Sequence, residues 1–246
     1  MPSEHIVHFM SDGCQLTGTL HLPDQPKPAV IIGCHGLLAH RQSPKQIALA
    51  ETLNQMGLAF LRFDHRGCGD SQGTQHAAEL LAARCRDLYH AMTFLQSHSR
   101  TGPVVGLFGS SFGGTVVMAA AAEHPMPLLI TFAAPVHSGA IHDGVVREIQ
   151  QHNTIRADSL AQFHFDIRPQ LPLLKNILVM HSEADEIVPV NHAGLIHEAA
   201  QEPKRVVIYK RGDHRMSDPS YQRRFLEECR TWCRERLGAS LGLLKQ

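Results

Sequence analysis

Short runs of apolar residues alternate along this chain with longer segments whose apolar residues recur at helical spacing. Two early runs, 5–10 and 15–22, are separated by Asp12-Gly13, a dipeptide typical of tight hairpin turns. The later runs lack the alternation of half-exposed strands, as expected where helices cover both faces of a sheet; they span residues 29–34, 58–63, 104–108, 128–132, 177–180 and 206–209. The pattern predicts an α/β fold with a mostly parallel eight-stranded sheet, which an antiparallel pair of strands opens.

Three segments carry signals for helices. Residues 43–46 read Ser-Pro-Lys-Gln, which supplies an N-cap, a proline at the first helical position and the glutamine of a capping box, and Gly57 ends this helix. Between residues 76 and 98, helical spacing predicts a stripe that faces the sheet, formed by Leu81, Cys85, Leu88, Met92 and Leu95. Asp218-Pro219 begins a last helix. The expected inner face of that helix consists of Tyr221, Phe225, Cys229, Trp232 and Cys233.

The apolar residues of the segment 136–172 follow neither the strand pattern nor the helix pattern. The segment is also longer than a typical connection between strand and helix. We interpret it as a short cap insertion over the carboxyl ends of the strands, where α/β proteins bind ligands. Phe163 and Phe165 within it are candidate substrate-binding residues, and docking of the insertion onto the body is the alternative. No repeat or linker divides the chain, which predicts one domain over residues 1–246.

Composition narrows the class of protein. The 246 residues are 43% hydrophobic and 19% charged, which is enough for a sizeable core and excludes global disorder. Lys+Arg and Asp+Glu both number 23, so the chain lacks the basic excess typical of proteins that bind nucleic acid or anionic membranes. The longest apolar run, 116–122, is too short to span a bilayer, and no signal peptide is evident. We therefore expect a cytoplasmic protein with a small-molecule partner, either a monomer or a dimer.

The cysteines and histidines raise two further hypotheses. Six scattered cysteines in a chain without export signals predict reduced thiols rather than disulfides. Eighteen histidines invite a metal site, but the sequence contains no HExxH, no CxxC and no close pairing at the spacing of metal ligands. We expect neither a metal nor another cofactor.

Residues 109–113 read Gly-Ser-Ser-Phe-Gly, the G-x-S-x-G pattern of a nucleophile elbow. An elbow holds its serine in a strained turn between a strand and a helix, and small residues two positions away on either side relieve crowding. The pentapeptide lies between a predicted strand and a predicted helix, as this geometry requires. An ordinary glycine-rich turn is the alternative, but the context favours Ser111 as a nucleophile.

A serine hydroxyl is a weak nucleophile until a base removes its proton. His214 lies in the sequence Arg-Gly-Asp-His-Arg, after the last predicted strand and before the last helix, which singles it out among the histidines. The base in turn needs a carboxylate that fixes its tautomer. Asp185 follows the seventh predicted strand and is our candidate, with Glu183 and Glu186 as neighbouring alternatives.

Acyl transfer also needs N–H donors for the oxyanion of the tetrahedral intermediate. The backbone N–H of Phe112, directly after the nucleophile, is one candidate. We assign the second to Leu37, on the loop after the strand 29–34, where Gly36 allows close approach of the backbone. His35 is expected to order this loop and is a further candidate for contact with substrate.

The ordered motifs resemble those of the α/β-hydrolase superfamily, most closely the bacterial serine esterases and dienelactone-hydrolase-like or acyl-peptidase-like members with short caps. The motifs are His35-Gly36, residues 64–71, residues 109–113, Asp185 with Val188-Pro189, and residues 212–214. The resemblance covers residues 5–237 and implies the α/β-hydrolase fold, with helices on both faces of the sheet. Dienelactone hydrolases proper have a cysteine at the position of Ser111. Asp64 and Arg66 are interpreted as structural hydrogen-bonding groups.

The resemblance, together with the order Ser111, Asp185, His214, implies a serine hydrolase that cleaves carboxylic esters of short or compact acyl groups through an acyl-enzyme. Cleavage of a thioester or an amide is the alternative within the same chemistry. A non-catalytic binding protein on the hydrolase fold is the alternative of another class, because a fold does not imply a function.

Overall fold

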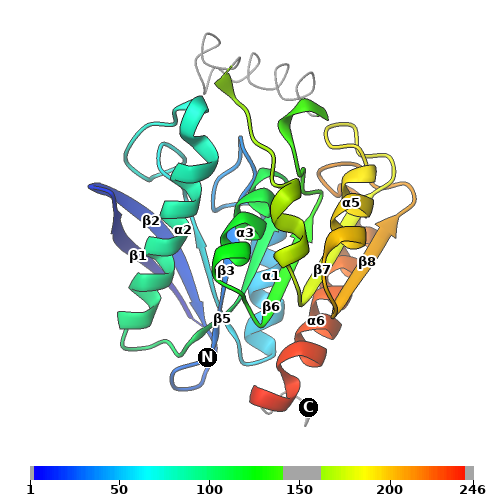
Figure 1. Ribbon diagram of the computed structural model, residues 1–246. Coiled ribbons are helices and arrows are strands. Elements are labelled where there is room, and N and C mark those ends of the chain that lie inside the picture. The colour runs from blue at the N-terminus through cyan, green and yellow to red at the C-terminus, as the bar shows by residue number, and fades with distance from the viewer. Residues whose placement is uncertain (1–2, 141–161, 242–246) are drawn as a thin grey trace.

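A single eight-stranded sheet forms the centre of the computed structural model, which describes residues 3–140 and 162–241 (Figure 1). In chain order the strands are β1 (Ser3–Ser11), β2 (Cys14–Leu22), β3 (Val30–Cys34), β4 (Ala59–Phe63), β5 (Val104–Ser110), β6 (Leu128–Phe132), β7 (Ile177–Ser182) and β8 (Lys204–Tyr209). Their order in the sheet is β1-β2-β4-β3-β5-β6-β7-β8. The β1–β2 and β2–β4 pairs are antiparallel and the others are parallel, which confirms the predicted sheet.

The opening hairpin turns where the sequence predicts it. Asp12 (φ 46°) and Gly13 (φ 81°) both adopt positive φ between β1 and β2, the conformation that a two-residue turn of type I′ requires. The register pairs Ser11 with Cys14 across this turn.

Helices cover both faces of the sheet, as Figure 1 shows. They are α1 (Pro44–Gln55), α2 (Leu80–Ser97), α3 (Phe112–Glu123), α5 (Asn191–Ala199) and α6 (Pro219–Leu241), with short 3₁₀ turns η1 (Ala77–Glu79), η2 (Ser138–Ala140) and η4 (Arg168–Leu173). One apolar core includes Leu88, Val116 and Ile196 from α2, α3 and α5. A second core, on the other face, includes Leu49 of α1 and Trp232 of α6. The continuous apolar strands are thus buried from both sides.

The predicted helix signals hold with one exception. Gly57 (φ 79°) follows the end of α1, and the apolar side chains predicted for the inner faces of α2 and α6 are buried or partly buried. The prediction of a capping box at the start of α1 is wrong, because the Ser43 side chain makes no capping hydrogen bond. The Gln46 side chain is instead buried, and its amide lies beside Gly33 of β3.

The described ends of the segment 136–172 dock on the body of the protein. Val136 and Phe165 are buried, and His137 forms an isolated β-bridge with Asp166. The centre of the predicted cap, residues 141–161, lies outside the described residues.

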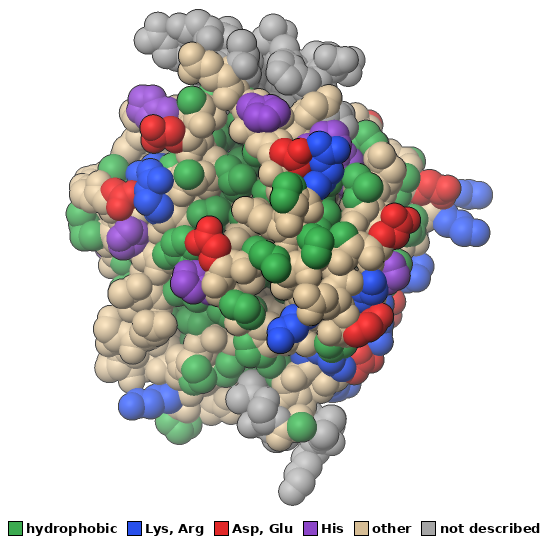
Figure 2. Space-filling view, viewed as in Figure 1, with side chains coloured by type: hydrophobic (Ala, Val, Ile, Leu, Met, Phe, Trp, Pro, Cys, Tyr) green, Lys and Arg blue, Asp and Glu red, His purple; other side chains and the backbone are tan. Residues whose placement is uncertain are grey.

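All six cysteines are free thiols, and five of them are buried. On the face shown in Figure 2, side chains of both charges are interspersed and neither sign gathers into a patch, in keeping with the zero net charge. Over the described residues, no helix is both long and apolar enough to cross a membrane.

Candidate active site

Ser111 occupies a strained turn between β5, which ends at Ser110, and α3, which begins at Phe112. Its backbone angles are φ 54° and ψ −130°, a region that residues other than glycine rarely adopt. Backbone hydrogen bonds hold the turn: the Ser111 N–H donates to the Phe132 carbonyl at 2.8 Å, and the Gly114 N–H donates to the Ser111 carbonyl at 2.7 Å. The pentapeptide therefore forms the elbow that the sequence predicts.

Two glycines of the pentapeptide are required by close backbone packing. A Cβ on Gly109 would lie 2.3 Å from the carbonyl oxygen of Gly113. A Cβ on Gly113 would lie 2.2 Å from the carbonyl oxygen of Cys34, on the neighbouring strand β3. Such distances are shorter than any real contact, so the strand and helix can meet at this angle only with glycine at both positions.

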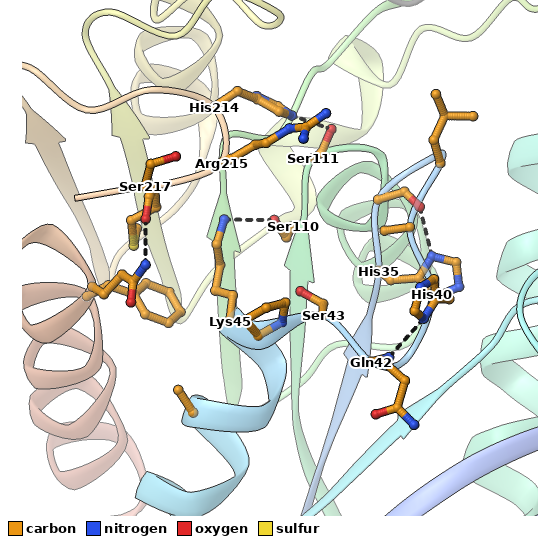
Figure 3. A pocket seen from close by; sticks show the side chains of 18 of the residues that line it. His35, His40, Gln42, Ser43, Lys45, Ser110, Ser111, His214, Arg215 and Ser217 are labelled. Carbon is orange, nitrogen blue, oxygen red and sulfur yellow. Dashed lines mark hydrogen bonds between the residues drawn. The ribbon is translucent and has the colours of Figure 1, made fainter. Parts of the chain in front are cut away.

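The structure brings Ser111, His214 and Asp185 into one hydrogen-bonded chain. The hydroxyl oxygen of Ser111 lies 3.0 Å from Nε2 of His214, and Nδ1 of His214 lies 2.9 and 2.8 Å from the two carboxylate oxygens of Asp185. Figure 3 shows the first of these hydrogen bonds. With the ring proton on Nδ1 donated to Asp185, Nε2 is free to accept the hydroxyl proton. The arrangement can therefore draw a proton from Ser111.

The side chain of Asp185 is fully buried and held as a carboxylate. It accepts hydrogen bonds from the backbone N–H groups of Ile187 and Val188 at 2.9 and 2.7 Å. Burial opposes ionisation, but the interactions with His181 and His214 outweigh it and hold the pKa of Asp185 well below its usual range. The carboxylate is thus charged when it faces the His214 ring.

The two alternative carboxylates have different roles. Glu186 accepts the backbone N–H of His214 at 3.0 Å and does not reach the ring. Glu183 is exposed, and its backbone N–H donates to the Tyr209 carbonyl at 2.8 Å. Of the three carboxylates that the sequence offers, the structure places Asp185 on the His214 ring.

A buried arginine fixes the loop that carries the predicted oxyanion donor. Arg84 of α2 is fully buried, and its guanidinium donates to three consecutive carbonyl oxygens, those of His35 (3.3 Å), Gly36 (3.2 Å) and Leu37 (2.9 Å). Because carbonyl and N–H point in opposite directions across a trans peptide, the Leu37 N–H is turned away from α2. The Phe112 N–H lies in the first turn of α3, where N–H groups have no acceptor within the helix.

His35 is buried in the same loop and holds it from inside. Its Nδ1 lies 2.8 Å from the Gly36 carbonyl, and its Nε2 accepts the His65 backbone N–H at 3.2 Å. Burial lowers the pKa of His35 well below its ordinary value, so the ring stays neutral. His35 also lines the cavity described below.

Phe163 and Phe165 are placed differently from their predicted role. Their rings pack against Phe112 with centroid distances of 5.4 and 5.2 Å, and both side chains are buried. Neither belongs to the lining of the cavity beside Ser111. They dock the insertion onto α3, the alternative reading of this segment, because an apolar side chain gains more from a closed aromatic cluster than from a wet cavity.

A cavity of about 840 Å³ lies beside Ser111 and His214. Its walls are the loop after β3, the first turns of α1, the turn at Ser110 and Ser111, and the segment from His214 into α6. Figure 3 shows side chains from these four segments around the cavity. The volume lies within the usual range of small-molecule sites, about 300–1,000 Å³.

Lys45 projects from α1 toward Ser110 in this cavity, as Figure 3 shows. Its amino group donates to the Ser110 hydroxyl at 3.4 Å and lies 3.7 Å from the centroid of the Phe132 ring. Burial lowers the pKa of Lys45 to about 7, against the attraction of Asp185 and Asp213. In the sequence, Lys45 stands out only as part of a helix start, although that helix directly follows the predicted oxyanion loop.

The loop from Asp64 to Ser71 is held by its own charged groups, as the sequence predicts. Asp64 is buried, pairs with Arg41 and accepts the Asp70 N–H at 3.0 Å. Arg66 pairs with the buried carboxylate of Asp87 at 2.7 Å. Neither Asp64 nor Arg66 lines the cavity. In the described part of the chain, no group of three or more His, Cys, Asp or Glu side chains is placed to hold a metal ion.

Comparison with known proteins shows the family of the chain. Residues 25–176 match the family described as serine aminopeptidase, S33 (Hydrolase_4). The chain belongs to this family of α/β hydrolases. It is 26% identical over 216 residues to the mitochondrial palmitoyl-protein thioesterase ABHD10 of Mus musculus, covering 76% of this chain and 69% of that protein.

Solved hydrolases share the fold. The esterase domain of a Rhodothermus marinus protein superposes with a TM-score of 0.72 at 23% identity, over 96% of this chain and all of that one. Est1E of Butyrivibrio proteoclasticus, with ferulic acid bound, gives a TM-score of 0.78 at 19% identity, over 94% and 99% of the two chains. The prediction of an α/β-hydrolase fold is confirmed.

Proposed function

We propose that this hydrolase cleaves carboxylic esters with Ser111 as nucleophile, His214 as general base and acid, and Asp185 as the carboxylate that orients it. The observation that carries the proposal is the continuous hydrogen-bonded chain from Asp185 through His214 to Ser111, which ends on a strained turn at the cavity wall. Strain of this kind persists at functional sites because it presents a side chain ready for reaction.

In the proposed reaction, the Ser111 oxygen attacks the ester carbonyl while Nε2 of His214 takes the hydroxyl proton. The backbone N–H groups of Leu37 and Phe112 stabilise the oxyanion of the tetrahedral intermediate. His214 then gives the proton to the departing alcohol, which leaves an acyl group on Ser111. Water, deprotonated by His214, releases the acid and restores the enzyme. Throughout, Asp185 stabilises the imidazolium.

We propose short-chain or compact acyl groups as the preferred substrates. The cavity volume suits a small molecule, and each further buried CH₂ contributes at most about 0.8 kcal/mol until the space is filled. Hydrolysis of 4-nitrophenyl esters from C2 to C16 tests this expectation, and a maximum of kcat/KM at C12 or beyond would contradict it.

Thioester cleavage is the second candidate. Two relatives point to it by name: the palmitoyl-protein thioesterase of Mus musculus and the thiohydrolase aneE of Aspergillus aculeatus, which is 28% identical over 145 residues. The same nucleophile and oxyanion donors serve both acyl groups. Comparing kcat/KM on an oxyester and a thioester with the same acyl group separates the two candidates.

The role of the carboxylate provides a test with an internal control. Asp185→Asn should lower kcat for 4-nitrophenyl butyrate about 10⁴-fold, because the amide stabilises the wrong tautomer of the base. Glu186→Gln keeps an acceptor for the His214 backbone N–H and should remain at least about 100-fold more active than Asp185→Asn. A loss below tenfold in Asp185→Asn would contradict the assignment.

A further inference from the structure

The charged side chains that line the cavity are all cationic within the part of the chain that the structure describes. Within the described residues, the lining includes Lys45, Arg215 and Arg223 and no aspartate or glutamate. Arg215 and Arg223 are exposed at the cavity, whereas Lys45 is partly buried on its wall. An excess of one sign in a concave site attracts ligands of the opposite sign.

Lys45 is held in one position on the wall of the cavity. It is the second residue of α1, and its ammonium group is fixed between the Ser110 hydroxyl and the Phe132 ring. Ser110 directly precedes Ser111, and the Ser111 N–H donates to the carbonyl of Phe132. The same backbone that positions the proposed nucleophile therefore also positions the ammonium group.

No carboxylate of the described chain forms an ion pair with Lys45. The two carboxylates whose charges attract Lys45 make other hydrogen bonds: Asp185 accepts from His214 and two backbone N–H groups, and Asp213 accepts the Ser217 N–H at 2.8 Å. Burial makes the charged amine costly, and it lowers the pKa of Lys45 to about 7. A buried charge of this kind is normally paired. Among the described residues, no carboxylate supplies the counter-ion of Lys45.

We propose that Lys45 binds an anionic oxygen group, a carboxylate or a phosphate, on the substrate itself. The inference rests on the proposed ester hydrolysis and names its substrate class: acyl esters that carry a negative charge within reach of the Ser110 side of the cavity. Lys45 is then a specificity-determining residue and takes no part in proton transfer. An ammonium suits this role because it acts as a compact point charge with three donors.

Two matched pairs of esters test the inference and locate the charge. For the acyl side, mono-4-nitrophenyl adipate is compared with 4-nitrophenyl hexanoate; for the alcohol side, 4-carboxyphenyl butyrate is compared with its neutral methyl ester. The readout is the ratio of kcat/KM between charged and neutral ester in each pair. In one pair, Lys45→Met should lower this ratio about 10- to 100-fold, the usual effect of losing a hydrogen bond to a charged group.

Control variants separate charge from general damage. Lys45→Arg keeps the cation and should retain most of the ratio, and Lys175→Met removes an exposed lysine outside the cavity and should leave the ratio unchanged. If Lys45→Met does not fold, inhibition of the unaltered protein by adipate and by adipamide serves as the test instead. Adipate should then inhibit hydrolysis of the neutral ester at least about tenfold more strongly than adipamide, on the same physical ground.

The outcomes distinguish this inference from the function on which it rests. If Ser111 hydrolyses the neutral esters and neither ratio falls in Lys45→Met, the substrate class is wrong while ester hydrolysis stands. Equal inhibition by adipate and adipamide would overturn the inference in the same way. If no ester is hydrolysed and Ser111 does not react with a serine-directed phosphonate, the proposed function fails and the inference fails with it.

Discussion

Replacing Arg84 with methionine removes the clamp on the loop that carries the proposed oxyanion donor. The guanidinium holds three successive carbonyls at 2.9–3.3 Å and also donates to the Gln75 side chain at 2.9 Å. Without it, the peptide that carries the Leu37 N–H keeps the contact between its Gly36 carbonyl and Nδ1 of His35 but loses the charged donor that holds the loop against α2. Complete loss of one oxyanion donor costs about 10²–10³ in kcat. Because Arg84 acts through the loop and does not touch substrate, we expect Arg84→Met to lower kcat about 10- to 100-fold.

The assay compares two arginines of the same helix. Arg86 is half-exposed and pairs with Asp12 at 2.8 Å, a surface contact worth at most about 1 kcal/mol. Arg84→Met should reduce kcat for a neutral 4-nitrophenyl ester with little change in KM. Arg86→Met should leave both kcat and KM unchanged. Chemical denaturation should show a loss of about 2–4 kcal/mol for Arg84→Met, since the hydrogen bonds that it removes are charge-assisted and buried.

Rescue distinguishes positioning from simple structural damage. Lysine keeps the charge at position 84 but lacks the planar fork that reaches several carbonyls at once. Arg84→Lys should therefore recover the free energy of unfolding more completely than kcat. A kcat of folded Arg84→Met within twofold of that of Arg86→Met would refute the positioning role of Arg84.

Three further predictions follow from the same structure. Gly113→Ala should abolish esterase activity and lower the melting temperature, because its Cβ would lie 2.2 Å from the Cys34 carbonyl; wild-type kinetics in this variant would contradict the packing described for the elbow. Gly194→Ala should instead raise the free energy of unfolding by about 0.5–1 kcal/mol, because Gly194 lies within α5 and none of the described neighbours that would meet an added Cβ lies within 4 Å. A measured decrease would contradict this open helical environment. The pKa of Lys45 is lowered to about 7, so about half of the cation is present at pH 7 and the rest is lost as pH rises. The preference for charged over neutral ester should therefore decline between pH 6 and 8.5, and a flat profile would contradict this.

The sheet could be predicted because strands that are buried on both faces consist mainly of consecutive apolar residues. Runs such as 177–180 are apolar without interruption, and each predicted run became a strand within two residues of its predicted ends. The elbow could be predicted for a similar reason, since Gly109 and Gly113 are imposed by backbone contacts that no other residue allows. Such constraints fix the residue types of short segments and are therefore visible in a single sequence, even where the contact itself is with a distant residue such as Cys34.

The rest of the site depends on contacts between distant segments. Arg84 lies among apolar residues on α2, and its partners are backbone carbonyls, which leave no pattern in the sequence. The cavity walls come from the starts of α1 and α6, more than 170 residues apart, as Lys45 and Pro219 illustrate. The aromatic side chain of Phe163 is equally compatible with a ligand site and with docking, and its packing on another ring decides the matter.

The most direct test of the account is covalent labelling of Ser111 by a fluorophosphonate, read by intact-protein mass spectrometry and peptide mapping. The hydrogen-bonded chain from Asp185 predicts a single adduct, on the peptide that contains Ser111, and none in Ser111→Ala. Labelling should also be strongly slowed in Asp185→Asn, because the base is no longer held in the reactive tautomer. Absence of an adduct on the folded protein, or an adduct on any other serine, would contradict the central claim.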